Sequence, residues 1–182
     1  AVLPHDRMSL VVEDDSAMIF NDTRKFGRVW LTSDPQKVLG HLGPEPLEED
    51  LSADRFYLML QERHRQLKPL LMDQDFLAGL GNIYTDEALF KARLHPLTIA
   101  SQVNRDEAAL LLASIREVLN EGIKRNGASI DWVYRGGDFQ NTFSVYQRDG
   151  QSCYVCGAVI QRAVIGQRGS HFCPNCQRLN GV

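Results

Sequence analysis

Four cysteines near the end of the sequence have the spacing of a metal site. They form two Cys-x-x-Cys pairs, Cys153 with Cys156 and Cys173 with Cys176, and sixteen residues separate the pairs. Thiolates from two such pairs can close a tetrahedron around zinc, and four thiolates leave no coordination position open for a substrate. We therefore predict one structural zinc ion. Two disulfides are the alternative, which a reducing cytosol disfavours.

The segment between the two cysteine pairs predicts a β-hairpin. Residues 158–165 are rich in β-branched side chains, residues 166–169 form a glycine-flanked turn, and residues 170–172 return toward the second pair. The metal would hold the open end of this hairpin and place Arg168 at its tip. An arginine there could bind an anion or could simply be solvated, and the pattern alone leaves both interpretations open.

A glycine-rich turn in residues 77–84 leads into an expected helix over residues 85–90. Gly79 and Gly81 let the backbone approach a ligand closely, and Asn82 supplies a donor. The first amides of a helix are free and its dipole favours an anion, so this helix start is suited to a phosphate. A plain connection between two helices is the alternative.

Helical patterns on either side of this turn would position it. Ser52 can cap a helix that runs to Gln61, Pro69 fits a first helical turn, and Asn104 with Glu107 matches a capping box. The helix after the capping box has an apolar stripe at helical spacing, which we interpret as core. The stripe consists of Ala108, Leu111, Leu112, Ile115, Val118 and Leu119.

The first residues indicate β-structure. Residues 8–13 and 17–21 flank a polar turn and predict a hairpin, which residues 28–32 could extend as a third strand. Two or three strands do not make a stable sheet by themselves. We therefore expect them to pair with strands that this sequence does not contain. The stretch of residues 33–54, rich in proline and acidic residues, is interpreted as a linker.

Composition places the chain among globular proteins. Of its 182 residues, 43% are hydrophobic and 24% are charged, which excludes disordered, collagen-like and coiled-coil chains. The net charge of −3 argues at face value against nucleic-acid binding, but residues 123–182 carry seven basic and three acidic side chains. The basic C-terminal part keeps that function open. No segment resembles a membrane span or a signal peptide, which predicts a cytosolic protein.

Several motifs occur in the same order as in the formamidopyrimidine-DNA glycosylases. Residues 68–96 resemble the helix-two-turn-helix motif of that family, and the cysteine segment resembles its C-terminal zinc finger. The resemblance extends from His5 to Gln177. The segments that carry it are residues 21–27 (Asn-Asp-Thr-Arg-Lys-Phe-Gly), 42–47, 68–74, 78–84 (Ala-Gly-Leu-Gly-Asn-Ile-Tyr), 87–90, 94–96 and 172–177.

The resemblance implies an α+β fold in three parts joined by a linker. Residues 1–34 would be the remnant of an N-terminal β-sandwich, and residues 35–50 the linker. Residues 51–147 would form a mostly α-helical helix-two-turn-helix domain that binds DNA, and residues 148–182 a β-hairpin zinc finger with one structural zinc ion.

The resemblance also implies a function in DNA base-excision repair. Family members are bifunctional DNA glycosylases and AP lyases. They flip an oxidised purine, 8-oxoguanine or a formamidopyrimidine, out of the duplex, cut its glycosidic bond and nick the strand. The implied partner is double-stranded DNA that contains oxidised bases or abasic sites. The implied setting is a monomer in the bacterial cytoplasm, associated with the nucleoid.

Matching positions imply roles for individual residues. Arg24 and Phe26 match the wedge loop, in which the arginine reads the orphaned cytosine and the phenylalanine splits the neighbouring stack. Arg168 matches the arginine that clamps the phosphates flanking the lesion and is implicated in the second elimination step. The other implied contacts, to phosphates or beside the lesion, are His5, Arg63, Lys68 and Asn82.

Residues 129–143 resemble the loop that closes over the flipped base, with Gly136 and Gly137 as its hinge. An ordinary surface loop is the alternative. Ala128 stands where the family usually has threonine, and Tyr-Arg-Gly-Gly replaces a stretch that contains Asp-Gly, so lesion preference stays open. The residues that would stack on the base are Trp132, Tyr134 or Phe139.

The family's nucleophile is an N-terminal proline, which a glutamate and a more distant lysine assist. The present sequence begins Ala1-Val2 and contains no segment that resembles this start. We therefore expect the chain as given to bind DNA weakly and to be inactive. Two other functions remain open: an endonuclease VIII-like glycosylase for oxidised pyrimidines, and a non-catalytic module that binds damaged DNA.

Overall fold

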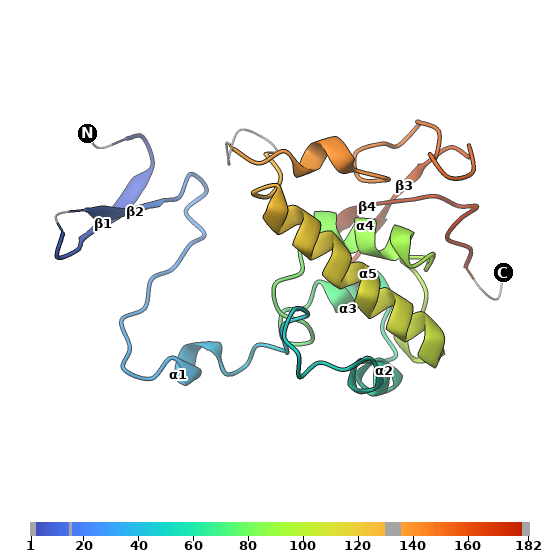
Figure 1. The fold of residues 1–182 in the computed structure, drawn as a ribbon, viewed down its shortest axis with the longest axis horizontal. Coiled ribbons are helices and arrows are strands. Elements are labelled where there is room, and N and C mark those ends of the chain that lie inside the picture. The colour runs from blue at the N-terminus through green and yellow to red at the C-terminus, as the bar shows by residue number, and fades with distance from the viewer. Residues whose placement is uncertain (1–2, 15, 130–135, 180–182) are drawn as a thin grey trace. The chain divides into compact units, whose positions relative to one another are not determined.

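The chain divides into two compact units, Ala1–Gly40 and His41–Val182. The computed structural model describes residues 3–14, 16–129 and 136–179. Figure 1 shows a strand hairpin in the first unit, and a helical body with a second hairpin in the other. Among the described helices, none has the length and apolar character needed to cross a membrane.

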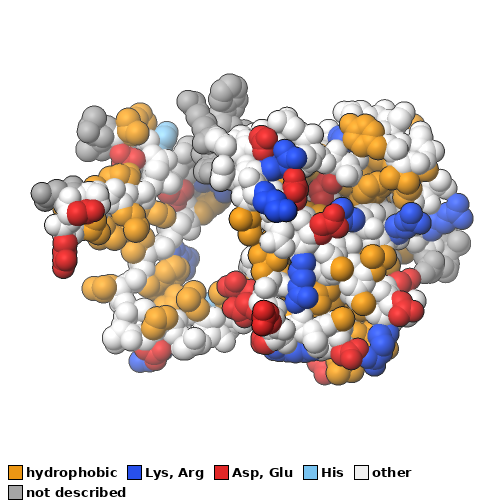
Figure 2. Space-filling model, in the orientation of Figure 1, with side chains coloured by type: hydrophobic (Ala, Val, Ile, Leu, Met, Phe, Trp, Pro, Cys, Tyr) orange, Lys and Arg blue, Asp and Glu red, His pale blue; other side chains and the backbone are white. Residues whose placement is uncertain are grey.

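The first unit contains the predicted hairpin. Strand β1 (Asp6–Val11) pairs antiparallel with β2 (Ala17–Asn21), with an irregularity near the start of β1. Large apolar side chains of both strands are exposed, and Figure 2 shows them as orange atoms over the hairpin. The unit's own described residues therefore do not bury its apolar surface.

One expectation for the first forty residues was wrong. Residues 28–32 are not a strand, because they pair with no other segment of the described chain and Leu31 is fully exposed. The stretch expected to be a linker contains a short helix, α1 (Gln36–Leu39), which follows Pro35. Proline is compatible with a helix start because its fixed φ suits the first turn.

The second unit is built on helices that the sequence marks clearly. Helix α2 (Ala53–Gln61) begins after Ser52, whose hydroxyl accepts from the amide of Arg55 at 3.1 Å. Helix α3 (Leu67–Leu71) holds Pro69 in its first turn, as predicted. Helix α5 (Arg105–Lys124) follows a short 3-10 helix, η1 (Ala100–Gln102), and begins with the predicted capping box.

Helix α5 packs against both α2 and α4 (Asn82–Lys91). Its predicted apolar stripe is buried, apart from Leu119, which is partly exposed. This stripe belongs to one apolar cluster that also includes Phe56, Leu67 and Leu89. The cluster fixes the orientation of α4, and with it the direction in which the first turn of α4 points.

Helix α4 begins three residues earlier than predicted, at Asn82 instead of Thr85. Gly79 has φ +83° and turns the chain, and Gly81 is the extended residue before the first helical turn. Glycine is favoured at a positive φ because it lacks a Cβ atom. Asn82 is therefore the first residue of the helix and not part of the turn.

The C-terminal hairpin forms, but its turn is shorter than predicted. Strand β3 (Gln161–Ile165) pairs antiparallel with β4 (Arg168–Phe172), and Ile165 is opposite Arg168. Only Gly166 and Gln167 lie in the turn, and both have a positive φ. A two-residue hairpin turn of type I′ needs positive φ at both residues, and its twist matches that of the strands. Arg168 is thus the first residue of β4 beside the tip, and not a turn residue.

Candidate nucleic-acid interface and metal site

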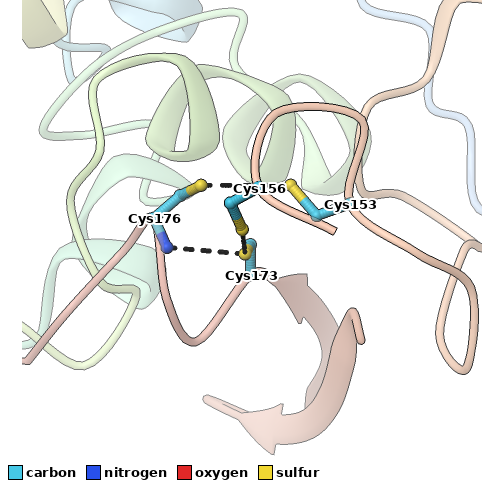
Figure 3. Close-up of side chains that lie close together, drawn as sticks. All are labelled: Cys153, Cys156, Cys173 and Cys176. Atoms are coloured by element: carbon cyan, nitrogen blue, oxygen red, sulfur yellow. Dashed lines mark hydrogen bonds between the residues drawn. The ribbon is translucent and has the colours of Figure 1, made fainter. Parts of the chain in front are cut away.

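The four cysteine sulfurs meet at one point in the finger (Figure 3). Their Sγ atoms all lie within 4.8 Å of one another. The closer pairs are Cys156 with Cys173 at 3.4 Å and Cys153 with Cys176 at 3.9 Å. Four bonds of about 2.3 Å to a tetrahedral zinc place sulfurs about 3.8 Å apart, whereas a disulfide needs about 2.05 Å. The predicted zinc site fits, and the alternative of two disulfides does not.

Backbone amides donate to two of the four sulfurs. The amide of Val155 donates to Cys153 Sγ, and the amide of Cys176 donates to Cys173 Sγ, both at 3.4 Å. A hydrogen bond from the Asn175 side chain lowers the pKa of Cys156 to about 6, whereas burial raises the pKa of Cys173 and of Cys176. Since zinc binds thiolates and not thiols, these donors suit a structural metal site. The strand β4 ends at Phe172, directly before the third ligand.

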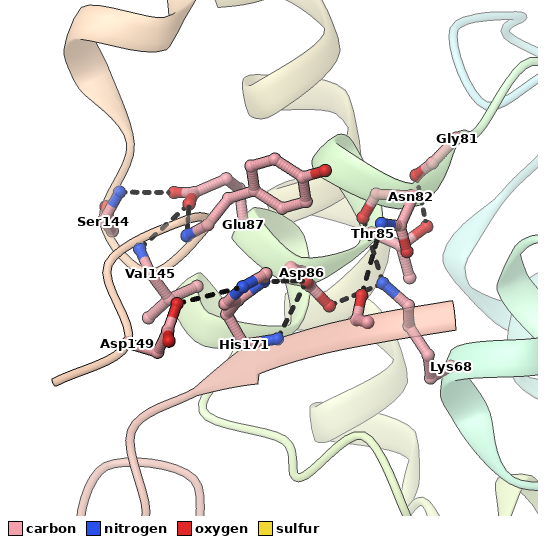
Figure 4. A network of polar contacts seen from close by, with 12 residues as sticks. Lys68, Gly81, Asn82, Thr85, Asp86, Glu87, Ser144, Val145, Asp149 and His171 are labelled. Atoms are coloured by element: carbon pink, nitrogen blue, oxygen red, sulfur yellow. Dashed lines mark hydrogen bonds and ion pairs between the residues drawn. The ribbon is translucent and has the colours of Figure 1, made fainter. Parts of the chain in front are cut away.

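Two consecutive acidic residues of α4 attach the finger to the helical body (Figure 4). The carboxylate of Glu87 is buried and accepts three backbone amides, from Ser144 at 2.8 Å and from Val145 and Tyr146 at 2.9 Å. The carboxylate of Asp86, also buried, accepts the amide of His171 at 2.9 Å. The segment that leads into the finger and strand β4 within the finger are therefore both anchored on one helix.

A third anchor lies just beyond the C-terminal end of α4. The buried side chain of Gln177 donates to the carbonyl of Leu94 at 2.9 Å and accepts the amide of Cys173 at 2.8 Å. Phe172 contacts the ring of His95 edge-on, with centroids 4.6 Å apart. The finger thus has a fixed orientation on the helical body.

The structure buries Lys68, which was predicted to contact a phosphate or to lie beside the lesion. Its side chain is 0% exposed, and its Nζ donates to Asp86 Oδ1 at 2.5 Å and to the carbonyl of Asn82 at 3.0 Å. Burial lowers the pKa of Lys68, and the carboxylate of Asp86 opposes that shift. Lys68 cannot donate directly to a DNA phosphate in this geometry. It supports the residue that begins α4 instead.

Asn82 contacts the backbone next to Arg168, and both residues were predicted from the sequence. Asn82 Nδ2 donates to the carbonyl of Gly169 at 3.2 Å, and Gly169 directly follows Arg168 in β4. The tip residue Gly166 packs close to Pro69 of α3. Arg168 is exposed. We call the surface formed by the first turn of α4 and Arg168 the α4–finger surface.

The first turn of α4 offers donors on this surface. No side chain caps the helix, and the amides of Asn82, Ile83 and Tyr84 donate to no acceptor among the described residues. Thr85 is the first residue whose amide is used, donating to the carbonyl of Gly81 at 3.0 Å. Free amides and the helix dipole both favour an anion, and a neighbouring guanidinium adds a positive charge.

Arg63 lies in the same unit, but among the described residues no hydrogen bond or ion pair links it to the α4–finger surface. It follows the end of α2, and its exposed guanidinium lies 3.6 Å from Glu62. On the face of the second unit seen in Figure 2, basic and acidic side chains are interspersed.

The first unit holds His5, Arg24 and Phe26, and Phe26 is 78% exposed. The guanidinium of Arg24 lies 5.6 Å from the ring centre of Phe26. Sequence reasoning missed Asp22, whose carboxylate accepts the amides of Arg24, Lys25 and Gly27 at 3.1, 2.9 and 2.6 Å. These bonds, that of Gly27 foremost, lower the pKa of Asp22 and fix the loop that presents Phe26.

The segment expected to close over the flipped base lies partly outside the described residues. These do not include residues 130–135, and so neither Trp132 nor Tyr134. Phe139 opens the short 3-10 helix η2 (Phe139–Thr142); it is 4% exposed and stacks on Tyr84 at 5.0 Å. Phe139 therefore belongs to the core and cannot stack on a base. Ser129 Oγ accepts the amides of Gly136 and Gly137 at 3.2 and 3.0 Å.

Sequence reasoning also missed the residues that attach the finger. Asp86, Glu87, His171 and Gln177 are polar and buried. The sequence contains only a weak indication of this role. Asp86 and Glu87 lie one helical turn from apolar residues, and an acidic side chain on a buried helix face needs a buried partner. Nothing in the sequence identifies partners that lie 57 to 85 positions away.

Family models match both parts of the second unit. Residues 42–133 match the formamidopyrimidine-DNA glycosylase H2TH domain, and residues 150–179 match the zinc finger found in FPG and IleRS. The chain therefore carries an FPG-type zinc finger with one structural zinc on its four cysteines.

Relatives that align with nearly the whole of this chain are also formamidopyrimidine-DNA glycosylases. The formamidopyrimidine-DNA glycosylase of Protochlamydia amoebophila is 41% identical over 183 residues, which is 96% of this chain and 66% of the relative. That of Thermus thermophilus is 43% identical over 184 residues, 96% of this chain and 68% of the relative. The chain thus spans about two thirds of the length of the relatives it matches.

Solved structures of proteins from the same family have the same fold as this chain. The MutM (Fpg) protein of Thermus thermophilus superimposes with a TM-score of 0.89 at 42% identity, covering 99% of this chain and 71% of that one. A complex of Lactococcus lactis Fpg with DNA containing an abasic site gives a TM-score of 0.88 at 38% identity, covering 98% and 68%. The agreement in motifs, sequence and structure shows that the chain belongs to the formamidopyrimidine-DNA glycosylase family.

Proposed function

We propose that this chain is the DNA-binding part of a base-excision repair enzyme, a DNA glycosylase and AP lyase for oxidised purines. Its α4–finger surface would bind the phosphates that flank a damaged or abasic nucleotide. The observation that carries the proposal is the Asn82–Gly169 hydrogen bond, which brings the free amides of α4 and Arg168 to one surface. The relative from Lactococcus lactis binds abasic-site DNA with the same fold.

The remaining sequence-based roles fit this proposal. Arg24 and Phe26 would enter the duplex as the wedge, and the exposed aromatic ring is suited to separate stacked bases. His5 and Arg63, both exposed, would contact phosphates. We further propose the division into residues 1–34, 35–50, 51–147 and 148–182, and a monomer that acts in the bacterial cytoplasm at the nucleoid.

The test is equilibrium binding of the 182-residue chain to a duplex with one abasic site, at several salt concentrations. Because each phosphate contact releases counterions, Arg168→Ala is expected to lower affinity about tenfold and to reduce the salt slope by about 1. Arg93→Ala is the matched control, since it removes an exposed arginine just beyond the opposite end of α4. Equal effects of the two variants would refute the proposed surface.

We also propose that the 182 residues alone bind DNA without cutting it. They contain no segment that resembles the proline–glutamate start to which the family's chemistry is assigned. Borohydride should therefore trap no covalent adduct between this polypeptide and a duplex containing 8-oxoguanine, while the full-length Thermus thermophilus relative serves as the positive control. An adduct with the 182-residue polypeptide would contradict the proposal.

A further inference from the structure

Asp86 lies in a closed hydrogen-bond circuit that joins three elements (Figure 4). Its Oδ1 accepts from Lys68 of α3 at 2.5 Å, and its Oδ2 accepts the amide of His171 of β4 at 2.9 Å. Lys68 also donates to the carbonyl of Asn82 at 3.0 Å. The side chain of Asn82 returns to β4 through Gly169 at 3.2 Å. We call these five residues the Asp86 circuit.

Two residues of the Asp86 circuit adjoin the proposed phosphate-binding groups, which are the free amides of α4 and the side chain of Arg168. Asn82 begins α4, whose free amides follow it, and Gly169 directly follows Arg168. The distance between the helix start and Arg168 is therefore set by bonds that pass through Asp86. A phosphate clamp depends on such spacing, because charge-assisted hydrogen bonds need good geometry at both ends.

Asp86 itself cannot touch DNA. Its side chain is 1% exposed, that of Lys68 is 0% exposed, and His171 is buried beside them. A buried ion pair adds little stability compared with apolar residues of the same volume, since desolvation offsets most of the attraction. Stability alone is thus a poor explanation for a charged pair between α3 and α4, where apolar side chains fill the surrounding core.

We propose that Asp86 is a positioning residue for DNA binding, which holds Arg168 at the correct distance from the first amides of α4. The inference rests on the proposed function of the α4–finger surface. It adds that binding by Arg168 depends on a residue that contacts no DNA. Without the Asp86 carboxylate, Arg168 is still present and exposed, but its distance from the first amides of α4 is no longer fixed.

A double-mutant cycle on the 182-residue chain separates positioning from stability. Affinity for the abasic-site duplex is measured for wild type, Arg168→Ala, Asp86→Asn and the combination, each with its zinc content verified. Arg168→Ala is expected to lower affinity about tenfold in wild type but about twofold or less in the Asp86→Asn background. Asp54→Asn is the matched control: it breaks an exposed ion pair with Arg105 and should leave the tenfold effect intact.

Asp86→Asn leaves Lys68 buried without its counter-charge and can prevent folding. The variant Lys68→Met with Asp86→Asn removes both charges, and the same loss of the Arg168 effect is expected in it. An Arg168 effect of equal size in all backgrounds would overturn the inference and leave the proposed function intact. Absence of any DNA binding by wild type, or of any Arg168 effect in wild type, would instead overturn the proposed function together with the inference.

Discussion

Removal of zinc is expected to unfold the finger and to abolish DNA binding, while most of the helical signal remains. The apolar cluster of the finger is small, with four fully buried members, and two of these, Cys153 and Cys173, are metal ligands. A two-stranded hairpin is marginal by itself, and structural zinc supplies about 10 kcal/mol or more of folding free energy in small finger domains. Without the metal, the unfolded finger no longer holds Arg168 in a fixed position beside α4.

The helices should survive because their core is separate. The large apolar cluster of the second unit lies between α2, α3, α4 and α5 and contains none of the four cysteines. Circular dichroism and binding to the abasic-site duplex are measured after chelation, after zinc is restored, and in Cys173→Ser. Restored zinc should recover binding in wild type but not in the variant. Unchanged binding after verified zinc loss would show that the finger is dispensable.

Substitution of Glu87 by alanine is expected to destabilise the second unit by about 3–5 kcal/mol, because it leaves three buried amides without an acceptor. Those amides belong to residues 144–146, which lead into the finger. Glu87→Gln keeps one oxygen, so it should lose roughly half as much. The measurement is urea unfolding of the zinc-loaded chain.

Glu117 provides the matched control for this prediction. Its carboxylate is 65% exposed and pairs with Lys91 at 2.6 Å. Exposed pairs contribute roughly 0–1 kcal/mol, so Glu117→Ala should change the unfolding free energy little. If Glu87→Ala cost no more than Glu117→Ala, the buried carboxylate would not be the anchor that the geometry indicates.

The sequence predicted those features that depend on near neighbours. The capping box at Asn104, the cap at Ser52 and each Cys-x-x-Cys pair involve residues only three positions apart. The hairpin β1–β2 follows from alternation around a short turn. Local hydrogen bonding and local backbone geometry decide such features, so their sequence patterns are reliable.

Features that depend on distant partners were missed or misplaced. By resemblance, Lys68 was expected to contact a phosphate or to lie beside the lesion, but Asp86, eighteen positions away, pairs with it inside the core. Phe139 was expected to stack on a base, yet Tyr84 and Phe143 hold it in the core. The third strand at residues 28–32 fails for the same reason: strands need a neighbour, which the described residues do not provide.

Amide chemical shifts test the α4–finger surface most directly. The ¹⁵N-labelled chain is titrated with an abasic-site duplex at low salt, and the shifts of Asn82, Ile83, Tyr84 and Gly169 are compared with those of Arg93 at the far end of α4. Because anions bind the free amides of a helix start, the first four signals should move most. Binding that shifts the Arg93 amide as much as those of Asn82 to Tyr84 would contradict the assignment of this surface.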